Sequence, residues 1–88
     1  MAVIKKKIWK EYFDKVASGK KRFEIRLADF EINDGDELIL EEWDEKKNRY
    51  TGRRIITNVS CVIKTKDCPF WEEEDIEKYG YQIIQIEI

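Results

Sequence analysis

Hydrophobic and polar residues alternate along most of this 88-residue chain, as they do in β-strands whose two faces meet different surroundings. The alternation predicts five extended segments, at residues 3–8, 22–28, 37–43, 53–64 and 81–88. In the segment 53–64, apolar side chains occupy both alternating sets of positions, so we expect a central and strongly bent strand there. The pattern as a whole predicts a protein built mainly from one β-sheet.

A helical repeat interrupts this alternation after the first strand. Trp9, Tyr12, Phe13 and Val16 recur at the spacing of one helix face, which predicts a short amphipathic helix over residues 10–18. Gly19 then fits the left-handed position that closes a helix. A second, acidic helical turn is expected over residues 70–78.

In the strand expected at 22–28, the two faces differ in chemistry. Three apolar residues share one face, which we expect to point into the core: Phe23, Ile25 and Leu27. Glu24 and Arg26 then share the opposite face, and Lys21 stands just before the strand. Two cations and a carboxylate beside a chain turn suit an anionic or amide-bearing ligand, although an exposed Glu–Arg pair on a sheet surface would look the same in sequence.

The connections between these elements are rich in turn-forming residues. Asn33, Asp34 and Gly35 form a strong turn signal. The strand that follows is expected to point Leu38 and Leu40 inward, and the polar stretch 44–48 after it predicts a hairpin loop. Five or six strands with one or two short helices fit a single α+β domain over residues 1–88, arranged as a small mixed β-barrel. Closing the sheet removes exposed edges, which a chain of this size can hardly leave open.

Composition restricts the surroundings and the chemistry. Apolar residues make up 42% and charged residues 41% of the chain, which predicts a compact core under a highly charged surface. No apolar run has the length of a membrane span and no signal-peptide pattern is present, so we expect a cytoplasmic protein that does not bind membranes. Two cysteines and no histidine predict neither a disulfide framework nor a metal site, and no cofactor is expected.

Charge is unevenly distributed along the chain. The net charge of −2 and the pI near 5.3 argue against a general nucleic-acid binder. Residues 1–26, 27–45, 46–66 and 67–88 nevertheless carry +6, −9, +7 and −6, which sum to −2. Opposite blocks could pair across neighbouring strands, or the two basic blocks could meet as one positive face that binds a short strand or a nucleotide.

The residues Gly19, Lys21, Glu24 and Arg26 form the pattern Gly-x-Lys-x-x-Glu-x-Arg between the expected helix and the next strand. This pattern resembles the signature of ASCH domains (activating-signal-cointegrator homology), which belong to the PUA-like superfamily of small β-barrels. The order of elements over roughly residues 4–65 is similar to that of small bacterial and phage ASCH-like proteins. The resemblance implies a PUA-like barrel and a nucleic-acid-related function.

Six residues make up the ligand site that we predict from the motif and its surroundings: Lys21, Glu24, Arg26, Trp43, Tyr50 and Arg53. The two motif cations would hold an anionic or carbonyl group, Glu24 would accept hydrogen bonds from a base edge, and Trp43 or Tyr50 would stack on the base. Trp71 and Tyr79 are further stacking candidates. The expected ligand is single-stranded RNA or a modified nucleoside, bound by a monomer.

The resemblance also implies an alternative activity. Some ASCH-like proteins are amidohydrolases that deacetylate N4-acetylcytidine with a Lys at the motif position, a Thr three residues later and a Glu elsewhere. Lys21 matches the Lys, but Glu24 stands where that family has its Thr, so a carboxylate would have to act on a water. The third residue could be any of three glutamates: Glu41, Glu42 or Glu74.

Two other functions remain open. Another ASCH relative is a ribonuclease that involves a Lys and a Tyr, for which Lys21 and Tyr50 are available. The alternating charge blocks would also suit a protein-interaction module. Catalytic candidates are therefore Lys21 and Glu24, in a protein that we expect to be a binding domain.

Overall fold

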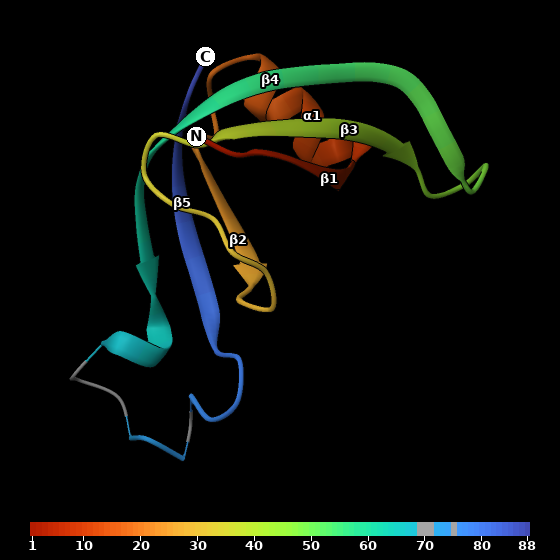
Figure 1. Cartoon of the computed structure of the whole chain (residues 1–88). Helices are drawn as coiled ribbons and strands as arrows, with labels where there is room; N and C mark the ends of the chain where they lie inside the picture. Colours follow the sequence, from red (N-terminus) through yellow and green to blue (C-terminus); the bar gives the residue numbers. More distant parts are fainter. Residues whose placement is uncertain (69–71, 75) are drawn as a thin grey trace.

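The structure is a computed structural model that describes residues 1–68, 72–74 and 76–88 (Figure 1). Over these residues the chain forms one α-helix, one 3-10 turn and five strands in the following order: β1 (Val3–Trp9), α1 (Lys10–Ala17), β2 (Phe23–Leu27), β3 (Glu37–Asp44), β4 (Arg49–Lys64), η1 (Thr65–Asp67) and β5 (Tyr81–Glu87). The strands form a single sheet in the order β1-β3-β4-β5-β2. The α+β class and the five predicted strands are confirmed. The sheet curls into a half-barrel whose two edges are β1 and β2, instead of closing.

The long central strand β4 gives the sheet its curl. It pairs with β3 along its first part and with β5 along its second, and its register with β5 shifts between Val59 and Cys61. Such a bulge bends a strand and exchanges the faces of the residues beyond it. Thr57 and Val59 are buried before the bulge, and Val62 packs on the core after it. This exchange explains why apolar residues occupy both sets of positions, as expected for a bent central strand.

The core lies between the curled sheet and α1. Nine buried side chains form it: Ile8, Phe13, Val16, Ile32, Leu38, Leu40, Val59, Ile84 and Ile86. The helix contributes Phe13 and Val16 and ends at Ala17, with Ser18 as its C-cap. Gly19 then takes a φ of +78° that glycine tolerates and other residues rarely adopt. The predicted helix, its glycine cap and the inward direction of Leu38 and Leu40 are confirmed.

The prediction of which face of β2 points into the core is wrong. Phe23, Ile25 and Leu27 were expected in the core, yet they are 45%, 58% and 46% exposed. Glu24, expected outside, is only 3% exposed. The register explains the inversion, because Glu24 lies opposite the fully buried Ile84 of β5 and shares its face. A carboxylate can take this place because two neighbouring cations, described below, neutralise it.

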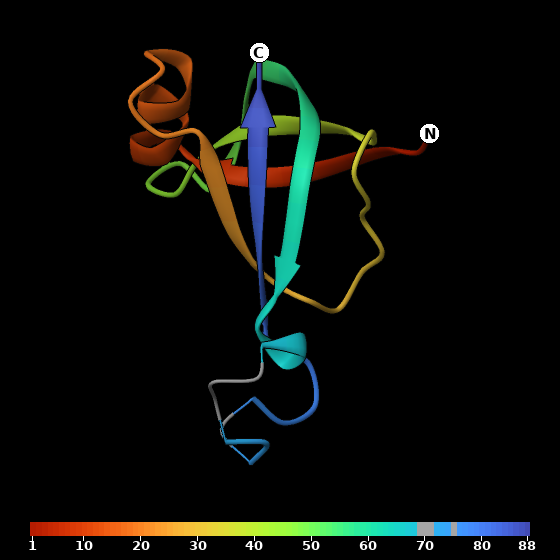
Figure 2. The same ribbon diagram turned by 90° about the vertical axis from the view of Figure 1, so that its left-hand side faces the viewer.

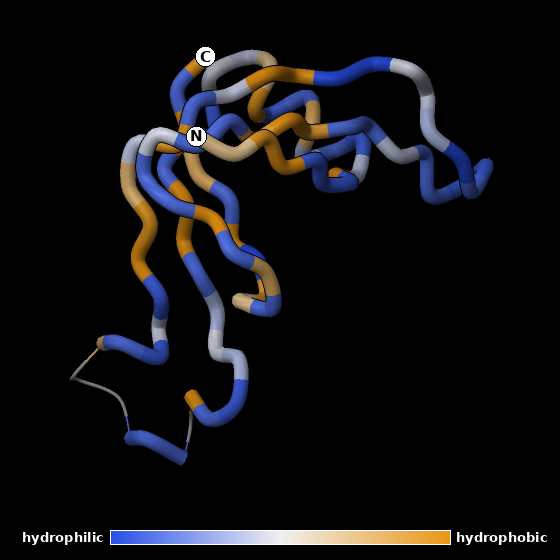
Figure 3. The backbone as a smooth tube through the Cα atoms, viewed as in Figure 1, coloured by the Kyte–Doolittle hydropathy of each residue, from blue (hydrophilic) through white to orange (hydrophobic). Residues whose placement is uncertain are grey.

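The remaining connections differ in how far the structure describes them. The polar loop 44–48 joins β3 and β4 as the predicted hairpin, which projects from the half-barrel and is hydrophilic at its tip (Figure 3). The helical turn expected over residues 70–78 lies partly outside the described residues, and Trp71 lies outside them. Within the described part of the chain, no helix has the length and apolar character needed to span a membrane.

Candidate functional site

An open cleft of about 830 Å³ lies where the end of β1, the helix α1 and the edge strand β2 meet. Five cationic side chains line it: Lys7, Lys15, Lys20, Lys21 and Arg26. Its only acidic lining residue among those described is Glu24. The cleft is therefore strongly basic, on a chain whose net charge is −2. Concave basic surfaces of this kind concentrate anionic ligands.

Glu24 holds the two motif cations together. Lys21 Nζ donates to Glu24 Oε1 and to the carbonyl oxygen of Phe23, while Arg26 Nε donates to Glu24 Oε2 at 2.9 Å. The Glu24 side chain is 4% exposed, whereas those of Lys21 and Arg26 are 15% and 22% exposed. Each carboxylate oxygen thus has its own cation, and the two cations face the cleft with their positions set by a buried acid.

Arg26 also joins the two edges of the half-barrel. Its Nη2 donates at 2.8 Å to the carbonyl oxygen of Lys7 on β1, the far edge from β2 in the sheet order. Its Nη1 has no hydrogen-bond partner among the described residues. The planar guanidinium presents five donors, so this group can bind an anion or a carbonyl without giving up its structural bonds.

The helix end positions Lys21. Gly19 N–H donates to Val16 O and Lys21 N–H donates to Lys15 O, both at 3.0 Å. These bonds close the helix and turn the chain directly into β2. The motif glycine therefore has a structural role, and the motif lysine is fixed by backbone contacts as well as by Glu24.

Exposed aromatic rings surround the same cations. Trp9, Tyr12 and Phe23 line the cleft and are 53%, 43% and 45% exposed. Lys21 Nζ lies 5.0 Å from the centre of the Phe23 ring. Exposed aromatic rings beside cationic side chains are common in sites that bind both the bases and the phosphates of single-stranded nucleic acids.

The structure places Trp43 and Tyr50 next to the cleft, not in it. Their rings meet edge to face with centroids 4.9 Å apart, where β3 and β4 pair near the hairpin. Neither is among the described residues that line the cleft. Lys7 connects the two places, because it lines the cleft and its Nζ lies 3.6 Å from the centre of the Trp43 ring.

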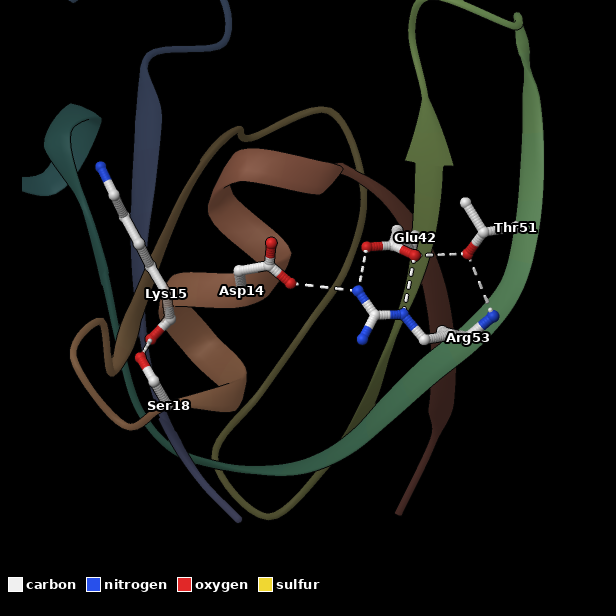
Figure 4. A network of polar contacts seen from close by, with 6 residues as sticks. All are labelled: Asp14, Lys15, Ser18, Glu42, Thr51 and Arg53. Atoms are coloured by element: carbon white, nitrogen blue, oxygen red, sulfur yellow. Dashed lines mark hydrogen bonds and ion pairs between the residues drawn. The ribbon is translucent and has the colours of Figure 1, made fainter.

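Arg53 lies in a separate network that fastens the hairpin strands to the helix (Figure 4). Its Nη2 donates to Glu42 Oε2 at 2.6 Å and to Asp14 Oδ1 at 3.0 Å, and Thr51 Oγ1 donates to Glu42. Glu42 is 1% exposed. The Arg53 guanidinium, followed by the Thr51 hydroxyl, lowers the pKa of the Glu42 carboxyl, and the two carboxylates raise the pKa of Arg53.

The sequence-predicted site residues therefore fall into three groups. Lys21, Glu24 and Arg26 come together in the cleft, Trp43 and Tyr50 lie beside it, and Arg53 belongs to the network. Sequence reasoning missed the other eight lining residues: Lys7, Ile8, Trp9, Tyr12, Lys15, Lys20, Phe23 and Ile25. A signal existed, since all of them lie in the basic block 1–26.

The cleft cations all come from that first basic block, so the two basic blocks do not jointly line it. The acidic strand β3 instead lies between β1 and β4, with Glu41 opposite Arg54 and Asp44 opposite Arg49. Opposite charge blocks on neighbouring strands were one of the two arrangements expected.

Comparison with known proteins yields a family and a fold. The family model described as a domain of unknown function (DUF3850) matches residues 4–85. The "uncharacterized 12.9 kDa protein in GpA 3'region" of Escherichia phage P2 is 38% identical over 68 residues, which are 77% of this chain and 58% of that protein. The chain thus spans a little over half the length of that relative. The crystal structure of hypothetical protein PH0355 is similar in fold, with a TM-score of 0.65, 22% identity, and coverage of 99% of this chain and 98% of that one.

Proposed function

The chain belongs to the DUF3850 family, and we propose that this member binds single-stranded RNA, or a modified nucleoside within it, in the cleft between α1 and β2. The observation that carries the proposal is the charge of that cleft. Five cations line it against one carboxylate, and both oxygens of that carboxylate are already bonded to cations. Apart from Glu11, which pairs with Lys15 on α1, these cations have no further carboxylate partner among the described residues, and an anion with several negative groups, such as a phosphate backbone, would supply the missing counter-charge.

The aromatic rings of the cleft would bind a base of the RNA by stacking. Trp9, Tyr12 and Phe23 offer apolar faces within the cleft, and a base stacked on such a ring gains about 1–3 kcal/mol with little sequence preference. Trp43 and Tyr50 would then receive a neighbouring base, with the Lys7 ammonium near the phosphate between the two. This arrangement favours a strand of several nucleotides over a free nucleoside.

Removal of two adjacent cleft lysines tests the proposal. The Lys20→Ala/Lys21→Ala variant should bind a short fluorescent single-stranded RNA at least about tenfold more weakly by anisotropy. The slope of log K against log salt should become shallower by about 0.7 for each phosphate that the variant no longer neutralises. The matched control is Lys46→Ala/Lys47→Ala, an adjacent lysine pair in the β3–β4 loop. Equal weakening in both variants would show that only overall charge matters, and would overturn the site.

Tryptophan fluorescence separates the cleft from its surroundings. RNA should quench the emission of the parent protein, and Trp9→Phe should remove more of that quenching than Trp43→Phe, because Trp9 lines the cleft. If quenching depended only on Trp43, the base-binding position would lie on the hairpin side instead.

We also propose that the family is a branch of the ASCH domains and that its curled sheet is an open form of the PUA-like barrel. The support is local. The four motif positions carry distinct tasks here, with Gly19 closing the helix and Lys21, Glu24 and Arg26 meeting in one cleft. A motif that serves ligand binding would need this convergence.

A hydrolase acting on N4-acetylcytidine is the second candidate, favoured by the contact of Lys21 with Glu24 inside the cleft. Two observations make it the weaker one. Tyr12 is the only hydroxyl-bearing residue among the described lining residues, and Glu41, Glu42 and Glu74 are not among them. Incubation with N4-acetylcytidine and chromatography for cytidine decides the matter. Cytidine formation that Glu24→Gln abolishes would establish the hydrolase.

A further inference from the structure

Among the described residues, the outer face of β2, β5 and the end of β4 is largely apolar and exposed, with Gln85 opposite Phe23 as a polar member. The centre of this face is a row of three isoleucines that lie opposite one another on neighbouring strands: Ile25, Ile83 and Ile63. Ile25 and Ile63 are 58% and 53% exposed. Leu27 beside Tyr81 extends the row at one end of the face, and Phe23 extends it at the other. We call these six residues the outer apolar face.

Isolated exposed apolar residues are common, but a contiguous set across three strands is not. Polar residues normally occupy the solvent side of an antiparallel sheet, whereas here that side carries exposed apolar residues and the inner side carries Glu24, Arg26 and Gln82 beside Ile84. Phe23 and Ile25 also form a wall of the cleft, whereas Ile63, Leu27, Tyr81 and Ile83 do not line it. The ligand proposed above therefore leaves most of the face uncovered.

The charges at the two ends of the outer apolar face are opposite. Exposed Lys20 and Arg22 precede β2 at the Phe23 end. The Tyr81 end follows an acidic stretch in which Glu72, Glu73, Glu74 and Glu77 are exposed. Figure 2 shows these two ends separated by the length of β2 and β5, with α1 at one end and residues 72–74 and 76–80 at the other.

From this distribution we propose that the outer apolar face binds a second copy of the chain, related by a two-fold axis near the Ile25–Ile83 pair. The strands of the two copies then run in opposite directions, so the basic end of each meets the acidic end of the other. Phe23 of each copy faces Leu27 and Tyr81 of its partner. The outer apolar face is thus self-complementary, since apolar residues meet apolar residues and each charged end meets an end of opposite charge, as an isologous interface requires.

This arrangement departs from the monomer expected from the sequence, because the apolar side of β2 was expected in the core. It does not depend on the ligand. It does bring a partner surface next to the wall of the cleft that Phe23 and Ile25 form, so the second copy would narrow the cleft mouth.

Sedimentation analysis over a wide concentration range tests the proposal, with Ile63→Glu as the disruptive variant. Ile63 lies in the central row and does not line the cleft. The matched control is Val3→Glu on β1, because Val3 and Ile63 are both 53% exposed. The parent and Val3→Glu should form dimers as concentration rises, and Ile63→Glu should raise the dimer Kd at least tenfold. A parent protein that stays monomeric at about 1 mM overturns the proposal.

Charge reversal tests the orientation and does not depend on Ile63→Glu folding. Arg22→Glu and Glu73→Arg should each weaken the dimer, and the combined variant should restore it. Arg22 and Glu73 are both exposed and are not lining residues of the cleft. Additive weakening in the combined variant would contradict the two-fold arrangement. An effect of Val3→Glu equal to that of Ile63→Glu would assign the dimer to another surface.

Discussion

Two buried glutamates, Glu24 and Glu42, sit in this small domain with cations beside them, and they differ in almost everything else. Glu24 is 3% and Glu42 is 1% exposed. The cations of Glu24 come from within three residues in sequence and line an open cleft. The cation of Glu42 is Arg53, eleven residues away across the hairpin, and Arg53 reaches on to Asp14 of the helix.

The number of partners separates the two sites as well. Glu24 has one cation on each oxygen, so the loss of one leaves the other in place. Glu42 is bonded to one cation and one hydroxyl among the described residues, so the loss of Arg53 leaves a buried carboxylate with only the Thr51 hydrogen bond and the charge of Lys10 to stabilise it. A buried ion pair therefore does not by itself mark a functional site. Redundant cations that face an open cleft are what distinguish the Glu24 site from the Glu42 pair.

Loss of Arg53 should give the largest effect. Arg53→Met keeps much of the side-chain volume but leaves Glu42 charged and buried, and we expect the melting temperature at neutral pH to fall by about 10 °C or more. Thermal unfolding followed by circular dichroism measures it. Lys47→Met, an exposed cation in the hairpin loop, is the matched control and should melt within a few degrees of the parent.

A second prediction uses pH on the same pair. Arg53 lowers the pKa of Glu42 below its ordinary value of 4.5, so the pair stabilises the protein above pH 4.5 and this contribution is lost as pH falls through the lower folded value. The difference in stability between the parent and Arg53→Met should therefore be largest near pH 7 and shrink below pH 4.5. Urea unfolding at several pH values measures the difference. A constant difference down to pH 3 would show that Glu42 is not the linked group.

Much of the fold follows from the pattern of apolar residues, and its failures have identifiable causes. The short helix, its glycine cap and the strands around Leu38 and Leu40 were predictable because local spacing determines them. The buried face of β2 was not predictable, because Glu24 lies on the core side, opposite Ile84, only with cations bonded to its carboxylate. Alternation identifies two faces but does not say which one a partner strand buries.

The candidate site was predictable only where it is local. Lys21, Glu24 and Arg26 were found together because they lie in one short motif at the mouth of a strand. The network of Arg53 was not predicted because its partners Asp14 and Glu42 are distant in sequence, and no local pattern reports such a contact. Lys7 and Tyr12 were missed for the same reason, since they reach the cleft only through the packing of β1 and α1.

A third prediction tests the redundancy of the cleft. Lys21→Met should lower the melting temperature by only a few degrees, because Arg26 still neutralises Glu24. RNA affinity should nevertheless fall several-fold. Parallel melting and anisotropy measurements on Lys21→Met and Arg53→Met should thus give opposite rankings for stability and for binding. The same ranking in both would mean that binding reports only the folded fraction, and the contrast between Glu24 and Glu42 would not hold.

The smallest expected effect concerns Tyr50, which belongs to the same hairpin as Arg53 but contacts an aromatic ring instead of a charge. Tyr50→Leu removes an edge-to-face contact with Trp43 but keeps an apolar side chain, and we expect a loss of only about 0.5 kcal/mol in the free energy of unfolding. If the pair receives a second base next to Lys7, this variant should weaken the binding of an oligonucleotide but leave a mononucleotide unaffected. If the binding of both ligands weakened equally, Tyr50 would contact the base that is bound in the cleft itself. If neither changed, the role of Trp43 and Tyr50 would be limited to stabilising the hairpin.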